Sequence, residues 1–231
     1  MSIFFKLPLG ALAFELPPAF ALHFDVQDFH DNDFAHYGIA CPPSIGRAVS
    51  KRQAEFLAGR RCAARALCDQ GCRIGDLPIG PNRAPVWPAG FLGSITHAGT
   101  IAAAVATPTG SMRGLGIDIE RVAADAALDA LEATVIVEAE RGLVDTLARS
   151  IGRAEALTLV FSAKESFFKA TAKAVGRIFD FQAVHIIDVP QWGLLELEVA
   201  EGLAVDLPLG RRMQASTTQL DDHTLMTACV W

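Results

Sequence analysis

The chain has 231 residues, of which 51% are hydrophobic and 20% are charged, enough to bury the core of one large domain or of two small ones. Its formal net charge of −6 does not favour nucleic acid as a partner. The five cysteines are odd in number and contain no CxxC pair with zinc spacing, so they predict reduced thiols in a cytoplasmic protein.

The first 45 residues predict short extended segments broken by proline. Residues 3–24 are mostly apolar, but Glu15 and three prolines interrupt them, and Lys6 alone makes a poor start for a signal peptide. We therefore expect neither a signal peptide nor stable membrane insertion. The acidic stretch over 25–33 predicts a solvated loop.

A helix is expected over residues 44–67, with Phe56, Ala63 and Leu67 on one apolar stripe. Arg60 lies inside that stripe, and Arg52 lies close to it. A buried guanidinium needs an anion, because burying it unpaired is costly. Two alternatives remain at this point: a carboxylate partner or snorkelling to solvent, and a phosphate clamp.

Residues 82–90 predict a rigid extended turn, because prolines flank Val86-Trp87. Short strands are expected around Ile95 and over 101–106, then a hairpin-like turn over 107–113 and a strand over 114–120. This hairpin would place His97 and the acids of the last strand on adjacent antiparallel strands.

Two carboxylates stand one residue apart in the apolar segment 114–120. In a strand, Asp118 and Glu120 share one face while Ile117 and Ile119 pack on the other. Such carboxylates repel each other unless a cation lies between them, and Mg²⁺ takes oxygen ligands of this kind. The alternative is an edge strand with two solvated acids.

Residues 121–160 are rich in Ala and Glu and predict helix, with Glu138, Glu140 and Asp145 as surface charges. Ser162 is expected to be the N-cap of a further helix and to form a capping box with Glu165. Lys169 follows Glu165 at i+4, a spacing typical of an ion pair. From residue 179 onward the pattern predicts strands, the last over 224–231.

Four motifs occur together and in order: KRQAEFLAGR over 51–60, APVWP through SITH over 84–97, GIDIE over 116–120, and FSAKESFFK over 161–169. Over residues 48–182 the chain resembles a 4'-phosphopantetheinyl transferase of the type found in enterobactin synthesis. Each motif is weak alone, and the combination is specific. Residues 1–45 and the last 50 do not contribute to the resemblance.

The resemblance implies an enzyme that moves phosphopantetheine from coenzyme A to a serine of an apo carrier protein and releases adenosine 3',5'-bisphosphate. The carriers would be acyl, peptidyl or aryl carrier proteins of siderophore and other non-ribosomal peptide synthesis, with fatty-acid or polyketide carriers as further substrates. It also implies dependence on Mg²⁺, with Mn²⁺ as a substitute. A cytoplasmic monomer is expected, with no nucleic-acid partner.

The resemblance also assigns roles to individual residues. The metal ligands would be Asp118, Glu120 and Glu165, with Glu165 as the base for the serine hydroxyl. Catalysis would then rest on Asp118, Glu165 and Lys169. Coenzyme A would be bound by Arg52, Arg60, Arg83, Thr96, His97, Lys164 and Lys169. The chain departs from the pattern of the family at two positions. Arg83 stands where some relatives have Lys, and Ile119 stands where some have a polar residue.

The expected fold, again from resemblance, is α+β: a pseudo-twofold pair of halves, each a small antiparallel sheet with a long helix. The halves would be residues 1–117, with the coenzyme A helix, and 118–231, with the metal ligands, and the active site would lie between them. Two rival functions remain open: a metal-dependent phosphodiesterase, and a carrier-binding module without catalysis.

Overall fold

The chain forms two compact units in the computed structural model, which describes residues 3–10, 12, 15–74, 76–80 and 83–231. Unit 1 comprises residues 1–8 and 17–111, and unit 2 comprises residues 9–16 and 112–231. Each unit has one antiparallel sheet and one long helix, so the α+β expectation is confirmed. The predicted division of the functional halves at residues 117 and 118 stays a prediction. Among the described residues, no helix is both long and apolar enough to cross a membrane.

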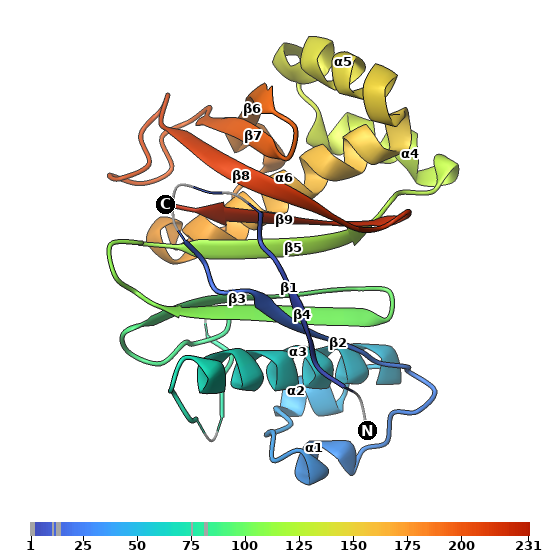
Figure 1. Cartoon of the computed structure of the whole chain (residues 1–231), viewed down its shortest axis with the longest axis vertical. Helices are drawn as coiled ribbons and strands as arrows, with labels where there is room; N and C mark the ends of the chain where they lie inside the picture. Colours follow the sequence, from blue (N-terminus) through green and yellow to red (C-terminus); the bar gives the residue numbers. More distant parts are fainter. Residues whose placement is uncertain (1–2, 11, 13–14, 75, 81–82) are drawn as a thin grey trace. The chain divides into compact units, whose positions relative to one another are not determined.

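Unit 1 is a four-stranded sheet in the order β1-β2-β4-β3, covered by helix α3 (Figure 1). Apolar side chains of the helix, including Ala63 and Leu67, pack against Phe20, Ala102 and Ala104 of the sheet. The elements of this unit are β1 (Phe5–Leu7), β2 (Ala19–His23), α1 (Asp33–His36), α2 (Pro43–Gly46), α3 (Ser50–Asp69), β3 (Phe91–Ala98) and β4 (Ile101–Pro108).

Helix α3 confirms the predicted apolar stripe but begins six residues later than expected. Residues 43–46 form the separate helix α2, and Val49 then stands in an extended conformation at ψ 152°. This extended residue interrupts the helical hydrogen bonds, so a continuous helix from Ser44 was wrong. The two short helices α1 and α2 also correct the expectation of extended segments only over residues 1–45.

The strands predicted around Ile95 and over 101–106 are present as β3 and β4, which pair antiparallel with each other, His97 opposite Ala102 and Ile95 opposite Ala104. The next prediction was wrong, because strand β5 (Leu115–Arg121) belongs to the other sheet. There Asp118 pairs with Thr227 of β9 (Thr224–Val230), while β4 pairs with β2 and β3. The fully buried β9 supplies a more distant partner that the local hairpin pattern could not reveal. The turn predicted over 82–90 starts at Asn82, outside the described residues.

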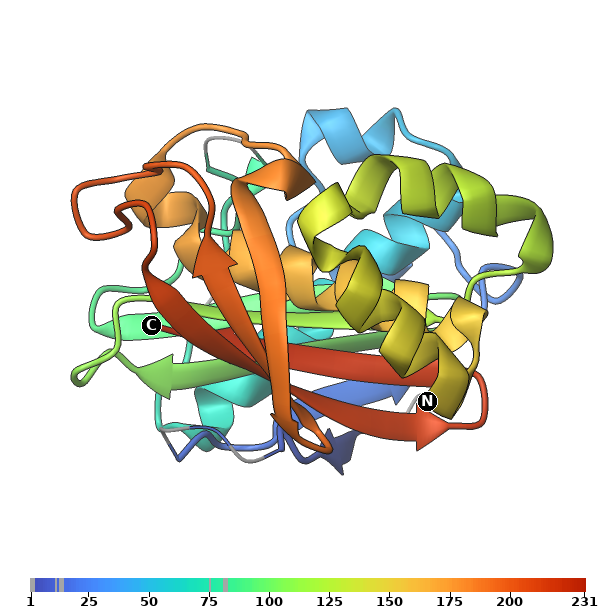
Figure 2. The same ribbon diagram turned by 90° about the horizontal axis from the view of Figure 1, so that it is seen from above.

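Unit 2 is a five-stranded sheet in the order β5-β9-β8-β7-β6, with helix α6 packed against one face (Figure 2). Its core includes Leu157, Phe167, Ile186, Leu197 and Leu225. The remaining elements are α4 (Asp125–Val135), η2 (Glu138–Glu140), α5 (Arg141–Ile151), α6 (Arg153–Val175), η3 (Phe181–Ala183), β6 (Val184–Gln191), β7 (Leu194–Val199) and β8 (Arg212–Asp221).

Helix α6 begins at Arg153, nine residues before the predicted start, so the N-cap and capping box assigned to Ser162 were wrong. The helix follows Gly152, which has a φ of 91° and separates it from α5. Ser162 lies in the middle of the helix and is fully buried. Its hydroxyl lies 2.9 Å from the hydroxyl of Thr227, so it joins α6 to the sheet instead of capping a helix.

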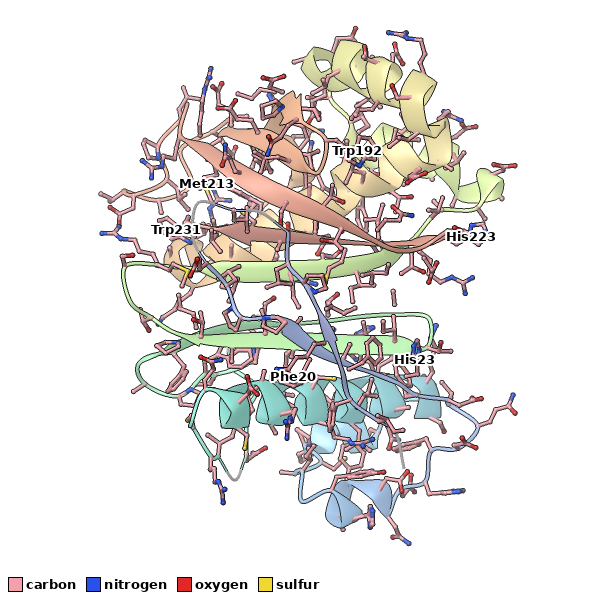
Figure 3. All side chains as sticks on the ribbon, viewed as in Figure 1. Phe20, His23, Trp192, Met213, His223 and Trp231 are labelled. Atoms are coloured by element: carbon pink, nitrogen blue, oxygen red, sulfur yellow. The ribbon has the colours of Figure 1, made fainter. Side chains whose placement is uncertain are left out.

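Two glycines allow β5 to lie unusually close to α6. A Cβ on Gly116 would stand 1.9 Å from the carbonyl oxygen of Ser166, and one on Gly114 would stand 1.9 Å from that of Ala170. The indole nitrogen of Trp231, labelled in Figure 3, donates to the same Ala170 oxygen at 2.9 Å. Only glycine fits such an approach, which brings the GIDIE strand onto the helix that carries Glu165 and Lys169.

Candidate active site

Strand β5 and helix α6 bring one lysine and three carboxylates into one electrostatic group. Asp118 is only 3% exposed, and its Oδ1 lies 2.6 Å from the Nζ of Lys169. Lys169 also donates to the carbonyl oxygen of Ile117 at 3.1 Å. The predicted ion pair of Lys169 with Glu165 is therefore replaced in the structure by one with Asp118.

Glu120 and Glu165 complete this group, which we call the acidic cluster: Asp118, Glu120, Glu165 and Lys169. The pKa of Glu120 is raised to about 7, first by burial and then by the charge of Asp118, with Lys169 lowering it and Glu165 raising it. Burial also raises the pKa of Glu165, with Lys169 lowering it and Asp118 raising it. Carboxylates that repel one another in this way gain from a bound cation.

The donor chemistry of the acidic cluster fits a hard divalent ion. Oxygen ligands on one strand face and on the facing helix are those that Mg²⁺ or Mn²⁺ prefers. In the part of the chain that the structure describes, no three side chains of His, Cys, Asp or Glu stand close enough together to form a metal site as placed. The Lys169 ammonium lies at Asp118 Oδ1, where it balances part of the negative charge.

Lys164 and Glu140 form a second charged pair in unit 2, and both side chains are 0% exposed. The Nζ of Lys164 lies 2.8 Å from Glu140 Oε2, and burial lowers the pKa of Lys164 while Glu140 raises it. The expectation that Glu140 is a surface charge was wrong. No sequence signal separates it from Glu138, whose side chain is 92% exposed two residues away. The assignment of Lys164 to phosphate binding stays a prediction.

Unit 1 brings Arg52 and His97 together. One guanidinium nitrogen of Arg52 lies 3.0 Å from the Nε2 of His97, and Glu55 Oε2 lies 3.4 Å from the same guanidinium nitrogen. Glu55 was not among the predicted site residues, although its i+3 spacing from Arg52 on a helix was a usable signal. The residues of this group come from α3 and β3, which pack together in unit 1.

Arg60 is 7% exposed on α3, and its guanidinium stands 4.6 Å from the centre of the Phe56 ring. Its Nε has no hydrogen-bond partner among the described residues. The pKa of Arg60 is lowered to about 10, chiefly by burial and also by the charge of Arg52, while Asp76 partly offsets this. An open hollow of about 530 Å³ lies beside it, lined also by Tyr37 and Asp76. A buried guanidinium with an unused donor next to such a hollow suits an anionic ligand.

Thr96 and Arg83 are the two remaining residues of unit 1 that were predicted to bind coenzyme A. Thr96 is buried on β3 and pairs in register with Ala103. Arg83 is exposed and has a left-handed backbone at φ 63°, and no described contact joins it to the other predicted residues. Their roles stay predictions.

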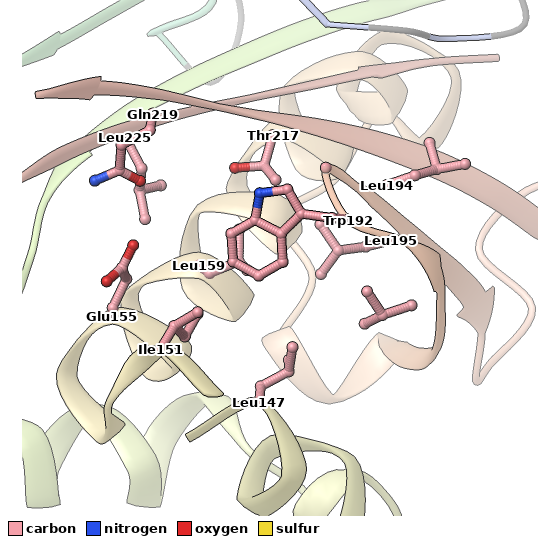
Figure 4. Close-up of a pocket in the computed structure, with 12 residues that line it drawn as sticks. Leu147, Ile151, Glu155, Leu159, Trp192, Leu194, Leu195, Thr217, Gln219 and Leu225 are labelled. Atoms are coloured by element: carbon pink, nitrogen blue, oxygen red, sulfur yellow. The ribbon is translucent and has the colours of Figure 1, made fainter. Parts of the chain in front are cut away.

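A separate hollow in unit 2 lies beneath the exposed indole of Trp192, against Leu159 and Leu195 (Figure 4). It has a volume of only about 40 Å³ and is lined by none of the predicted site residues. It is too small to hold a coenzyme, since ligand sites usually exceed about 300 Å³.

Comparisons with known proteins identify the family of the chain. Residues 43–107 match the 4'-phosphopantetheinyl transferase N-terminal domain, and residues 114–201 match the 4'-phosphopantetheinyl transferase superfamily. Enterobactin synthase component D of Salmonella typhi is 36% identical over 171 residues, which cover 71% of this chain and 69% of that protein. The protein of the same name from Escherichia coli K12 is 41% identical over 155 residues, covering 65% and 68% respectively. The 4'-phosphopantetheinyl transferase Svp of Streptomyces mobaraensis is 36% identical over 150 residues, covering 64% and 60%. The chain therefore belongs to the 4'-phosphopantetheinyl transferase family, as an enzyme similar to enterobactin synthase component D.

Proposed function

We propose that this enzyme transfers the 4'-phosphopantetheinyl group of coenzyme A to a serine hydroxyl of an apo carrier protein. The observation that carries the proposal is the acidic cluster on β5 and α6 of a chain from this family, in which Lys169 pairs with Asp118 and the charges of Asp118, Glu120 and Glu165 act on one another. In the proposed reaction the serine Oγ forms a bond to the β-phosphorus of coenzyme A, and the phosphoanhydride bond breaks. The other product is adenosine 3',5'-bisphosphate.

Asp118, Glu120 and Glu165 would hold a Mg²⁺ ion, for which Mn²⁺ can substitute. When bound, such an ion neutralises charge on the pyrophosphate and on the leaving phosphate. Glu165 takes up the serine proton, directly or through a water molecule, because a hydroxyl is a weak nucleophile at neutral pH.

The cationic side chains bind the phosphates of coenzyme A. Arg60 suits the 3'-phosphate, because its mostly buried guanidinium has an unused Nε donor and lines an open hollow. Arg52, Arg83, His97 and Lys169 would donate to the remaining phosphate oxygens. Each charge-assisted hydrogen bond of this kind contributes about 1.5–3 kcal/mol.

The carrier substrates are proposed to be peptidyl or aryl carrier proteins of non-ribosomal peptide synthesis, with acyl carrier proteins as further substrates. This range is the one that the motif resemblance implies, and the name of one relative, enterobactin synthase component D, is consistent with a role in siderophore synthesis. We further propose that the enzyme acts in the cytoplasm as a monomer.

The test is intact-protein mass spectrometry of a purified apo carrier protein incubated with the enzyme, coenzyme A and Mg²⁺. We expect the carrier mass to rise by one phosphopantetheine group, with release of adenosine 3',5'-bisphosphate and loss of the reaction in excess chelator. Cleavage of coenzyme A without any change in carrier mass would instead identify a phosphodiesterase. Carrier binding without either reaction would identify a non-catalytic module.

A further inference from the structure

The buried pair of Lys164 and Glu140 has no role in the proposed reaction, yet it is costly to build. Both side chains are fully buried, and their charged atoms lie 2.8 Å apart. Taking two ions out of water costs several kcal/mol each, and only good geometry with further hydrogen bonds offsets this. A fully buried ion pair with such short contacts is suited to a task that depends on its fixed position.

All three hydrogen-bond donors of the Lys164 ammonium already have partners. Nζ donates to the carbonyl oxygen of Val135 at 2.8 Å, to Glu140 Oε2 at 2.8 Å and to the carbonyl oxygen of Phe181 at 3.1 Å. A lysine ammonium has three donors and no acceptor. Lys164 would have to break one of these buried bonds to reach a phosphate.

Both carboxylate oxygens of Glu140 also have hydrogen-bond partners, Lys164 among them. Its Oε1 accepts a hydrogen bond from the backbone N–H of Ile186 at 2.7 Å, and its Oε2 accepts one from that of Val137 at 3.0 Å. The pair therefore joins α6 to four other segments of unit 2: the end of α4, the residue before η2, η3 and β6.

The position of Lys164 on α6 connects this network to the acidic cluster. Lys164 directly precedes Glu165, and Lys169 follows little more than one turn later. A side-chain end lies about 6 Å from the helix axis, so rotating α6 by about 20° would move the Glu165 carboxylate by about 2 Å. Displacements of about 1 Å at a reacting centre can cost about a hundredfold in rate.

We infer that Lys164 and Glu140 are a buried positioning pair that holds α6 so that Glu165 and Lys169 face Asp118, and that Lys164 does not contact coenzyme A. The inference rests on the proposed function, because it assigns Glu165 to the metal and to the serine proton. It replaces the phosphate role that the resemblance implies for Lys164.

Lys164→Met and Glu140→Gln test the inference by separating metal binding from coenzyme A binding. We expect the Kd of the full-length protein for Mn²⁺, measured by electron paramagnetic resonance, to rise about tenfold or more in either variant. The kcat for carrier modification should fall about a hundredfold. The Kd and KM for coenzyme A should stay within about twofold of the parent values. The double variant should lose no more Mn²⁺ affinity and no more kcat than the more impaired single variant, because both changes act through one pair.

Lys173→Met is the matched control, since Lys173 is an exposed lysine on the same helix. It should leave the Kd for Mn²⁺ unchanged. A tenfold rise in the Kd for coenzyme A in Lys164→Met, with parental Mn²⁺ binding, would overturn the inference and return Lys164 to a phosphate site.

Measurement on the parent protein keeps the inference testable if the variants do not fold. In a lysine side-chain nitrogen NMR spectrum, we expect an ammonium signal that exchanges slowly with water and does not shift when coenzyme A is added. A slowly exchanging ammonium that shifts on coenzyme A addition would overturn the inference. Failure of the proposed function would appear differently, as a parent enzyme that leaves the carrier mass unchanged.

Discussion

At the scale of single residues, the structure shows which groups surround Arg60, an arginine at an unusual position in the sequence. A guanidinium in the apolar stripe of α3 needs compensation for its lost hydration. The Phe56 ring offers a cation–π contact at 4.6 Å, and Asp76 offers a favourable charge, but the Nε remains without a hydrogen-bond partner among the described residues. The structure therefore retains the two alternatives of the sequence analysis and adds an unused donor that favours an anionic ligand.

Arg60→Ala should weaken coenzyme A binding by about tenfold or more, because a charge-assisted contact contributes about 1.5–3 kcal/mol. Titration calorimetry with coenzyme A and with dephospho-coenzyme A would locate the contact. If Arg60 binds the 3'-phosphate, the variant should bind the two ligands with similar affinity, whereas the parent should prefer coenzyme A. Lys51→Ala, at an exposed position on the same helix, should change neither affinity. Parental coenzyme A affinity in Arg60→Ala would make Arg60 a structural residue.

Asp118→Asn should raise the Kd for Mn²⁺ at least tenfold and nearly abolish carrier modification. The amide keeps the shape of the side chain but removes the charge that both a metal and Lys169 require. Electron paramagnetic resonance titration with Mn²⁺ measures the first effect, and the carrier mass assay measures the second. Asp145→Asn, at an exposed position of α5, should behave like the parent. Transfer that persists in Asp118→Asn despite excess chelator would exclude the metal assignment.

At the scale of elements, the contact between β5 and α6 depends on the absence of a side chain at two positions. The carbonyl oxygen of Ser166 occupies the space where a Cβ of Gly116 would stand. This approach lets Lys169 reach both Asp118 and the carbonyl oxygen of Ile117. The glycine of the GIDIE motif is thus a packing requirement for the acidic cluster.

Gly116→Ala should lower the free energy of unfolding by about 3 kcal/mol or more, because β5 and α6 must move apart to admit the methyl group. Thermal denaturation followed by circular dichroism measures the loss. Gly142→Ala in α5 is the matched control, since a Cβ there meets no atom within 4 Å. It should stabilise the chain by up to about 1 kcal/mol, the usual gain of Ala over Gly in a helix. Equal stability of the two variants would contradict the packing argument.

At the scale of the whole molecule, two buried cysteines report separately on the two units. Cys62 lies in α3 of unit 1 and Cys229 in β9 of unit 2, and both are 0% exposed. Burial raises the pKa of each thiol to about 12. Because alkylation requires the thiolate, burial should protect both thiols from reagents as long as each unit stays folded.

Brief treatment with iodoacetamide at pH 8, followed by peptide mass spectrometry, should modify the exposed Cys41 and Cys68 and spare Cys62 and Cys229. A pKa near 12 in place of 9 lowers the thiolate fraction at pH 8 about a thousandfold. In urea both protected thiols should react, each at the denaturant concentration that unfolds its own unit. Rapid modification of either one in native buffer would contradict the core described for its unit.

The sequence alone determined the family, the class of fold and most of the elements. The motifs KRQAEFLAGR, GIDIE and FSAKESFFK each lie within one short segment, so their residues can be read without knowing how distant segments pack. The alternation of Asp118 and Glu120 with Ile117 and Ile119 likewise follows from the geometry of a single strand, and both isoleucines are fully buried.

Only the tertiary structure decided which segments are partners. Strand β5 pairs with β9, more than 100 residues later, although the local turn favoured a hairpin with β4. Glu140 is buried although its neighbour Glu138 is exposed, because Lys164 and Ile186 offer it hydrogen bonds from 24 and 46 residues away. Ser162 lies inside a helix instead of capping one, because Thr227 of β9 satisfies its hydroxyl. Local sequence patterns reflect the propensity and periodicity of single elements. Strand pairing and burial depend on contacts between residues far apart in the sequence, and no local pattern contains these contacts.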